Sequence, residues 1–512
     1  MKTQFTEILR HIFRKKRNVY LDHNATTQVS RNVRRKMNRV LKYQYGNPSS
    51  LYSLAGSSVE IIDEARQQVA DAIHACPEEV IFTGSATESN NAVLQSLSNH
   101  YYPKKKKIIA APIEHSSVIN TLEFLKTKGI VVEYCPVDRY GRIILEELKK
   151  LIDDDTFLIC CMLANNEIGT IQDIKEITRI ARKYDIVVIS DCVQALGKIP
   201  VDVSDLGVDY ASFSAHKLNG PKGVGALYIR MGSPFEPLIY GGHQEYGLRA
   251  GTENIHNIAG FGAACQNIDS LLAASDKISN NKTRFIQRLK NICPECIVNS
   301  PEENCVPNTI SITFPGINNA GLIALLDYHG IAISGGSACS AHDEKPSHVL
   351  KAIGISDKAA EETVRISLGY ETSIRDIQYT LDVFKNCIKN RDLLVNMITS
   401  EQLDRNMLFD EQVYILDIRP QFLRNRVKSL PNSHETSFFS IKKYLNQLPR
   451  HKHILVVCQH GNLSYIATQY LKSKGFNQVS SLSSGISGWK EYNIELYKVF
   501  AGENISELQP AL

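Results

Sequence analysis

Three residues of types that work together in cofactor chemistry occur in order in this chain. Asp191 ends an apolar run, Lys217 ends the segment SFSAHK, and Cys339 ends the segment SGGSAC. A lysine amine forms a Schiff base with a cofactor aldehyde, and a carboxylate opposite a pyridinium nitrogen keeps that nitrogen protonated, so the ring accepts electrons. A cysteine thiolate is the nucleophile best suited to attack sulfur. Together they indicate pyridoxal phosphate chemistry coupled to a sulfur nucleophile.

The surrounding pattern predicts the elements that position these groups. Residues 186–190 are uniformly apolar up to a serine, which is typical of a buried parallel strand that delivers Asp191 at its carboxyl end. Residues 80–82 read as a strand entering a turn at Gly84, and the small residues beyond it predict a phosphate cradle at a helix start, with Thr87 as a hydroxyl donor. Strands and helices alternate through residue 230, so we expect a largely parallel sheet with crossover helices.

Further ordered motifs resemble the group I cysteine desulfurases over about residues 19 to 395. They are LDHNATT (21–27), GNPSS (46–50), TGSATESN (83–90), NNEIGT (165–170) and PSHVL (346–350), beside the lysine and thiol segments. The resemblance implies an α/β protein of the pyridoxal-phosphate-dependent fold type I. Its large domain would span about 19–260, with a mostly parallel sheet, and its small α/β domain about 261–395.

The same resemblance implies roles for individual residues. The implied cofactor contacts are Lys217, Ala86, Thr87, His115, Asn166, Asp191, Gln194, Ser214, His216 and Thr252. Thr252 matches a hydroxyl supplied by the partner subunit, which implies a homodimer, and His115 matches the histidine that stacks on the ring and moves protons. The implied substrate contacts are Arg365, whose guanidinium suits a carboxylate, and Asn47.

The implied reaction converts L-cysteine to L-alanine and leaves a persulfide on Cys339. Gly335 and Gly336 predict a mobile loop that carries the sulfur to a protein acceptor, for iron-sulfur clusters, thio-cofactors or transfer-RNA thiolation. Two segments, 334–336 and 342–345, depart from the family pattern without removing a reacting group. A fold-related aminotransferase or selenocysteine-specific lyase is disfavoured by the loop thiol, and a catalytically idle scaffold by the retained reactive residues.

A second domain is predicted for residues 397–497. Thr399 or Ser400 can cap a new helix, strands are expected at 414–417 and 454–457, and Cys458 follows the second strand at a turn into a helix, where backbone amides stabilise a thiolate. The ordered segments resemble a single rhodanese domain; they are DIRP (417–420), CQHGNLS (458–464), GF (475–476) and GISGW (485–489). Leu463 replaces the usual loop arginine and residues 427–430 replace a usual GHI segment, so thiosulfate sulfurtransferase activity is not expected.

Persulfide exchange needs only Cys458 and its amides, and we expect sulfur to pass from Cys339 to Cys458, within one subunit or across the dimer.

Composition fits this interpretation. The chain has 512 residues, 43% of them hydrophobic and 22% charged, with a net charge of +4, so no nucleic-acid partner is expected. No apolar stretch is long enough for a transmembrane helix, and twelve scattered cysteines favour the reducing cytoplasm. The pair Cys293 and Cys296 has zinc-like spacing but no second pair of ligands, so no metal site is predicted.

Both ends of the chain extend past the predicted domains. Residues 1–18 form a basic amphipathic pattern compatible with packing on the domain, an organelle presequence or a membrane-surface contact. Residues 498–512 read as a C-terminal tail.

Overall fold

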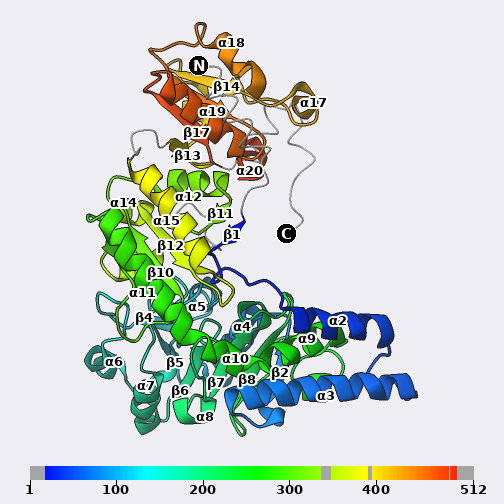
Figure 1. The fold of residues 1–512 in the computed structure, drawn as a ribbon. Coiled ribbons are helices and arrows are strands. Elements are labelled where there is room, and N and C mark those ends of the chain that lie inside the picture. Colours follow the sequence, from blue (N-terminus) through cyan, green and yellow to red (C-terminus); the bar gives the residue numbers. More distant parts are fainter. Residues whose placement is uncertain (1–17, 336–346, 390–394, 484, 493–512) are drawn as a thin grey trace.

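A computed structural model describes residues 18–335, 347–389, 395–483 and 485–492 of the chain. Residues 1–17 of the N-terminal extension, Gly336 and Cys339 of the predicted loop, and the C-terminal tail therefore lie outside the described residues. Figure 1 shows three successive units, with the last, drawn in orange and red, at the opposite end from the large sheet.

The first unit is built on a seven-stranded sheet. Its strand order is β2-β8-β7-β6-β5-β3-β4, and only β8 runs antiparallel to its neighbours. The strands are β2 (Val80–Thr83), β3 (Lys107–Ala110), β4 (Val131–Tyr134), β5 (Thr156–Cys160), β6 (Val187–Asp191), β7 (Tyr210–Ser214) and β8 (Gly225–Ile229). This is the mostly parallel sheet that the alternating sequence pattern predicts.

Helices cover both faces of that sheet because successive strand residues point to opposite sides. In β2, Ile81 belongs to one apolar cluster with residues of α4 (Ala86–Tyr101) and α5 (Ser116–Lys126). Val80 and Phe82 belong to another, with residues of α3 (Ser53–Ile73), α7 (Ile174–Ala181) and α9 (Ile255–Cys265). The remaining helices of this unit are α2 (Arg31–Tyr43), α6 (Leu145–Leu151), α8 (Val203–Leu206) and α10 (Ile268–Ala273). Two apolar layers therefore sandwich the sheet.

The second unit has its own core and includes the start of the described chain. Strands β12 (Thr363–Ser367), β10 (Thr309–Thr313) and β9 (Ile297–Val298) form an antiparallel sheet, and β1 (Val19–Tyr20) pairs with β11 (Ile331–Ala332). The helices are α11 (Ser275–Ile292), α12 (Asn319–Tyr328), α13 (His348–Ala352), α14 (Asp357–Glu361) and α15 (Ile374–Lys389). The described chain thus begins with a strand of the small domain and then continues into the large domain.

The third unit is a five-stranded parallel sheet in the order β13-β17-β16-β14-β15. Its strands are β13 (Asn396–Ile398), β14 (Val413–Asp417), β15 (His434–Glu435), β16 (His453–Val457) and β17 (Val479–Leu482). Its helices are α16 (Arg405–Phe409), α17 (Gln421–Arg424), α18 (Ile441–Tyr444), α19 (Asn462–Ser473) and α20 (Gly485–Tyr492).

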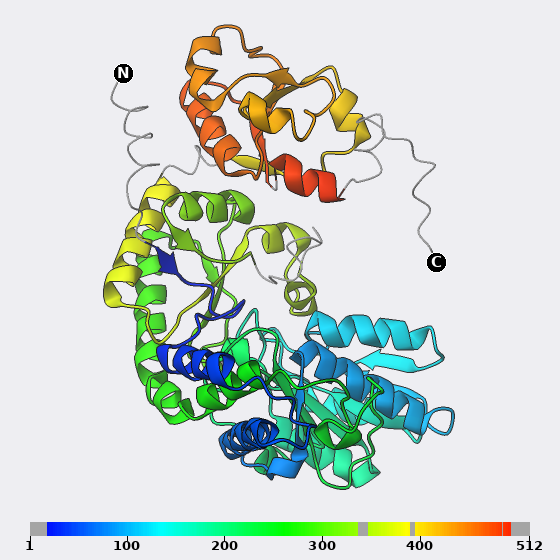
Figure 2. The ribbon, with the colours of Figure 1, turned by 90° about the vertical axis from the view of Figure 1, so that its right-hand side faces the viewer.

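This third unit packs on the small domain. Helix α19 and strand β13 contact α12, and the ring of Tyr465 on α19 is buried in the small-domain core. Figure 2 shows the same arrangement from a second direction, with the third unit above the small domain. None of the helices in the described part of the chain has the length and apolar composition that crossing a membrane requires.

Candidate active site

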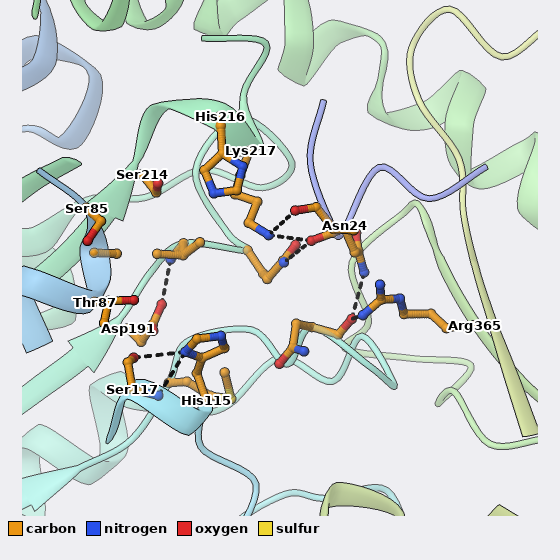
Figure 3. A pocket seen from close by; sticks show the side chains of 16 residues that line it. Asn24, Ser85, Thr87, His115, Ser117, Asp191, Ser214, His216, Lys217 and Arg365 are labelled. Atoms are coloured by element: carbon orange, nitrogen blue, oxygen red, sulfur yellow. Dashed lines mark hydrogen bonds between the residues drawn. The ribbon is translucent and has the colours of Figure 1, made fainter. Parts of the chain in front are cut away.

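A pocket of about 190 Å³ gathers most of the predicted site residues. It lies at the carboxyl ends of β6 and β7, where ligands bind in parallel α/β sheets. Its lining, drawn in Figure 3, is Asn24, Ala25, Ser85, Ala86, Thr87, His115, Ser117, Met162, Asn166, Asp191, Val193, Gln194, Ser214, His216, Lys217 and Arg365.

Lys217 enters the pocket from the short helix that follows β7. Its Nζ donates to the backbone carbonyl oxygens of Asn24, at 2.6 Å, and Ala25, at 2.8 Å. These carbonyls belong to the segment between β1 and α2, so a chain stretch from the small-domain side holds the amine in place. A lysine held at the centre of a pocket can reach an aldehyde there.

Asp191 ends β6 and is 6% exposed. One carboxylate oxygen accepts the Val193 N–H at 3.0 Å, and the other accepts from the Asn90 amide at 3.1 Å. A carboxylate has about four acceptor positions, so Asp191 keeps capacity for a further donor in the pocket. A protonated ring nitrogen is such a donor.

His115 is the N-cap of α5 and faces the pocket (Figure 3). Its Nδ1 accepts the Ser117 N–H at 3.1 Å and lies 2.9 Å from the Ser117 hydroxyl. Because Nδ1 is the acceptor, the proton of the neutral ring is assigned to Nε2. The ring therefore has a fixed orientation and one defined N–H.

Glu114, next to His115, is a buried carboxyl that the sequence did not single out. It accepts the Met162 N–H at 2.6 Å and is 1% exposed. Burial, together with the nearby charge of Asp191, raises the pKa of Glu114 to about 8, although the Met162 hydrogen bond opposes this shift. Glu114 is accordingly protonated at neutral pH.

An anion cradle lies at the start of α4. Ser85 caps this helix by accepting the Glu88 N–H at 3.1 Å, which leaves Ala86 and Thr87 in the first turn against the pocket. Strand β8 approaches closely at Gly225, where a Cβ would lie 2.6 Å from the Ser85 carbonyl carbon. His216 lies across the pocket; burial and the nearby charges of Lys217 and Lys222 lower the pKa of His216 to about 4. Its ring is neutral at neutral pH and keeps a hydrogen-bond donor.

Arg365 is 2% exposed, on β12 of the small domain. Its guanidinium donates to Asp22 Oδ1 at 2.8 Å and to the Asn166 carbonyl oxygen at 3.1 Å. Its buried Nε has no hydrogen-bond partner among the described residues. The guanidinium thus retains donor capacity beside the pocket, which suits a substrate carboxylate.

Three predicted residues stand apart from this pocket. Asn47 and Thr252 do not line it, and the Asn47 carboxamide accepts the Ser49 N–H at 3.0 Å instead. Cys458 lies in the third unit, buried at the turn between β16 and α19. Its Sγ accepts the Gly461 N–H at 3.2 Å and lies 3.3 Å from the Ser464 hydroxyl, so one amide of the predicted amide nest contacts the sulfur.

The Cys458 turn requires glycine. Gly461 has φ +90°, and a Cβ there would lie 2.0 Å from the Ser483 carbonyl oxygen. Leu463, at the position of the usual arginine, is 38% exposed. The turn therefore presents an apolar side chain where an anion-binding cation is usual.

The residues that sequence reasoning missed mostly hold others in place. Asp22 orients Arg365, Ser117 orients His115, and Asn24 accepts from Lys217. Asp22 and Asn24 belong to the LDHNATT motif, so the sequence marked this segment as important but did not indicate what either residue does. For Ser117 and Glu114 the only signal was their adjacency to His115.

Comparison with known proteins identifies the class of this fold. Residues 19–380 match the family described as aminotransferase class-V, and residues 399–492 match the rhodanese-like domain. The chain belongs to the class-V aminotransferases, whose cysteine desulfurase members depend on pyridoxal phosphate, and carries a C-terminal rhodanese-like domain.

Individual relatives show which members of this class the chain resembles. The chain is 42% identical over 378 residues to the "Cysteine desulfurase IscS" of Dictyoglomus turgidum, covering 73% of this chain and 95% of that one. Among solved structures, a "NifS-like protein" is similar with a TM-score of 0.70 and 39% identity, covering 73% of this chain and all of that chain. "SspA in complex with cysteine" is similar with a TM-score of 0.62 and 35% identity, covering 70% of this chain and all of that chain. The predicted resemblance to the cysteine desulfurases, the fold class and the rhodanese-like domain are confirmed.

Proposed function

We propose that this protein is a pyridoxal-phosphate-dependent cysteine desulfurase that converts L-cysteine to L-alanine and forms a persulfide on Cys339. The observation that carries the proposal is the convergence of Lys217, Asp191, His115 and Arg365 on one pocket from separate segments of two domains. The named relatives support this activity, and one similar structure was solved with cysteine.

The pocket fits the cofactor. The first turn of α4, with Ser214 and His216 opposite, would hold the phosphate; Asp191 would face the ring nitrogen, and His115 would stack on the ring. Asn166 and Gln194 would hydrogen-bond the ring and its phenolic oxygen. When bound, the cofactor supplies an aldehyde for the Lys217 amine and an electron-accepting ring that weakens bonds near the substrate α-carbon.

Each reactive side chain then has its own role in the reaction. Arg365 binds the substrate carboxylate, and the Lys217 amine removes the α-proton once the substrate has displaced it. The Cys339 thiolate forms an S–S bond with the substrate sulfur while the Cβ–S bond breaks. The electron pair of that bond stays on the carbon fragment, which is protonated and leaves as L-alanine. His115, with its proton on Nε2, is placed to transfer protons in the pocket.

A homodimer completes this site in the proposal. Thr252 does not line the pocket of its own chain, as expected for a residue that serves the partner's cofactor. Large apolar side chains on α2, on the segment that follows it and on the loop before Thr252 are strongly exposed; they include Leu41, Tyr45, Leu51, Tyr52 and Tyr240. Exposed apolar side chains of this size would suit a protein interface if they form one patch.

Sulfur would next pass from Cys339 to Cys458. The segment that holds Cys339 joins β11 to α13 of the small domain, and the rhodanese-like unit packs on that same domain through Tyr465. The transfer could run within a subunit or across the dimer. A protein of an iron-sulfur, thio-cofactor or transfer-RNA pathway would be the final acceptor, in the reducing cytoplasm that the scattered cysteines favour.

The test of the desulfurase activity is spectroscopic and chemical. Purified protein should show a visible band from bound pyridoxal phosphate and release L-alanine from L-cysteine under reductant. Lys217→Ala should abolish both the covalent band and turnover, and Lys183→Ala, an exposed lysine on the large domain, should change neither. A wild-type protein that binds no cofactor would favour the scaffold interpretation, and transamination without sulfur release would favour an aminotransferase.

The relay has a separate test. Cys458→Ser should preserve alanine formation and remove trapped persulfide from the C-terminal domain. Persulfide labelling of that domain that is unchanged in the variant would reject the relay without touching the desulfurase activity.

A further inference from the structure

Lys198, a partly buried lysine whose amine is enclosed, is used in none of the steps above. Lys198 follows β6 in a turn, and it lines a second, smaller cavity together with Lys217. No ion pair joins Lys198 to a carboxylate among the residues that the structure describes. A buried amine without an acidic partner is unfavourable unless other groups satisfy it, so its hydrogen bonds require an explanation.

Both hydrogen bonds that the Lys198 amine donates lead to residues of the active site. Its Nζ donates to Asn24 Oδ1 at 2.9 Å and to Gln194 Oε1. The backbone oxygen of the same Asn24 accepts from Lys217 Nζ at 2.6 Å and from Gln194 Nε2 at 2.9 Å. Asn24 is 1% exposed and Gln194 is 3% exposed, so water does not substitute for these contacts.

These contacts fix the direction of the Gln194 amide. Oε1 is held by a donor, Lys198, and Nε2 by an acceptor, the Asn24 carbonyl. Rotating the amide by half a turn would set Oε1 against the Asn24 carbonyl oxygen, two acceptors facing each other, and would remove the acceptor to which Lys198 donates. The donor end of Gln194 is therefore the end available to an acceptor in the pocket.

We propose that Lys198 is a positioning residue for the active site: it acts through Gln194, whose amide it holds with the N–H donors toward the phenolic oxygen of the cofactor. The inference rests on the proposed function, because it requires pyridoxal phosphate in the pocket. Lys198 itself does not line the cofactor pocket. A second contact, to Asn24, ties the same lysine to the segment that holds Lys217.

The protonation state of Lys198 does not decide this role. Burial, together with the positive charges of Lys217 and Arg365, lowers the pKa of Lys198 well below the ordinary lysine value. A neutral amine still has two hydrogens, which is the number that Asn24 and Gln194 accept. Both hydrogen bonds therefore persist whether or not the amine is charged.

A double-mutant cycle tests whether Lys198 acts through Gln194. Lys198→Met keeps the apolar stem and removes both donors, Gln194→Leu removes the amide, and the two are also combined. The first measurement is the dissociation constant of pyridoxal phosphate, and the second is the pH midpoint of its visible absorbance change in the bound state. Lys183→Met serves as the control for loss of an exposed lysine.

Lys198→Met should weaken cofactor binding about five- to ten-fold, the equivalent of one buried hydrogen bond. It should also move the absorbance midpoint to higher pH, because the ionised phenolic oxygen loses a donor. In the Gln194→Leu background the same substitution should change the dissociation constant by less than about two-fold, since the group through which it acts is gone.

Equal effects of Lys198→Met in both backgrounds, or an unmoved absorbance midpoint, would overturn the inference. If Lys198→Met does not yield folded protein, Lys198→Leu takes its place in the cycle, because it also removes both donors. Failure of the wild type to bind the cofactor would contradict the proposed function as well, whereas additive effects contradict this inference alone.

Discussion

Replacing Gly225 with alanine should distort the phosphate cradle without removing any reactive side chain. A Cβ at Gly225 would lie 2.6 Å from the Ser85 carbonyl carbon, 2.8 Å from the Ala86 nitrogen and 2.8 Å from the Phe213 oxygen. All three are backbone atoms and cannot rotate away. Ordinary contacts begin at 3.4 Å, so the start of α4 must move by about 0.6–0.8 Å relative to β8, and the Phe213 carbonyl of β7 by about 0.6 Å.

A shift of this size is large for a binding site. Overpacking commonly costs about 1–3 kcal/mol, and misplacing a positioned group by about 1 Å can reduce activity about a hundred-fold. We therefore expect Gly225→Ala to raise the pyridoxal phosphate dissociation constant about ten- to a hundred-fold, which equals about 1.4–2.8 kcal/mol. Equilibrium dialysis of the cofactor-free protein followed by visible absorbance measures this constant.

Gly56 provides the matched control. It lies inside α3 and an added Cβ would meet nothing within 4 Å, so Gly56→Ala should leave cofactor binding unchanged and stabilise the helix by about 0.5–1 kcal/mol. If Gly225→Ala bound pyridoxal phosphate as tightly as Gly56→Ala does, the placement of the phosphate at the start of α4 would be refuted.

Three further predictions follow from the described contacts. Arg365→Lys keeps a positive charge but loses the planar guanidinium, so KM for L-cysteine should rise at least about ten-fold in steady-state assays while cofactor affinity stays within about two-fold; unchanged KM would contradict the carboxylate assignment. The buried Glu114 carboxyl binds its proton more tightly in the folded state, so the free energy of unfolding should fall by a few kcal/mol as pH rises from about 4.5 to about 8. Glu114→Gln should lose that dependence in denaturant titrations at several pH values, and an identical pH profile would contradict it. Tyr465→Ala removes a ring that is 1% exposed, which costs about 3–5 kcal/mol in a core, so persulfide transfer to Cys458 should slow while alanine release continues; equal transfer rates in a quenched time course would show that docking through Tyr465 is dispensable.

Local patterns predicted the elements that carry the reactive groups. The apolar run before Asp191 forms β6, and the expected strands at 80–82, 414–417 and 454–457 form β2, β14 and β16 with ends shifted by at most a residue. These strands are buried on both faces, so their residues are apolar without interruption and the signal is strong. The strand-end position of Asp191 then follows directly from the chain.

The start of the third unit shows where local reasoning was wrong. The sequence predicts a helix capped by Thr399 or Ser400. The Thr399 hydroxyl does accept the Gln402 N–H at 3.2 Å, and the Gln402 side chain accepts the Thr399 N–H in return. These contacts close only one turn. The helix begins at Arg405, where Asp404 caps it by accepting the Met407 N–H at 2.8 Å. The sequence thus offers two successive capping residues, Thr399 and Asp404, for one helix. Leu403 lies between them and is fully buried, and this tertiary contact cannot be read from the sequence.

The supporting residues of the site were not predictable from spacing. Asn24 and Lys198 lie far apart in sequence and meet only because the segment after β1 crosses from the small domain to the turn after β6. The role of Glu114 depends on complete burial beside Asp191, which its sequence neighbours do not reveal. Reactive groups carry a chemical signature in their residue type, whereas the residues that orient them are defined by tertiary contacts.

The central claim is that the Lys217 pocket removes sulfur from cysteine and that Cys339 receives it. Mass spectrometry of the Cys339 peptide after brief incubation of cofactor-loaded protein with L-cysteine, with alanine quantified in the same sample, tests this most directly. The account predicts one added sulfur atom on Cys339, alanine in equal amount during the first turnover, and neither product in Lys217→Ala. Alanine formed while the Cys339 peptide stays unmodified, or a wild-type protein that leaves cysteine intact, would contradict it.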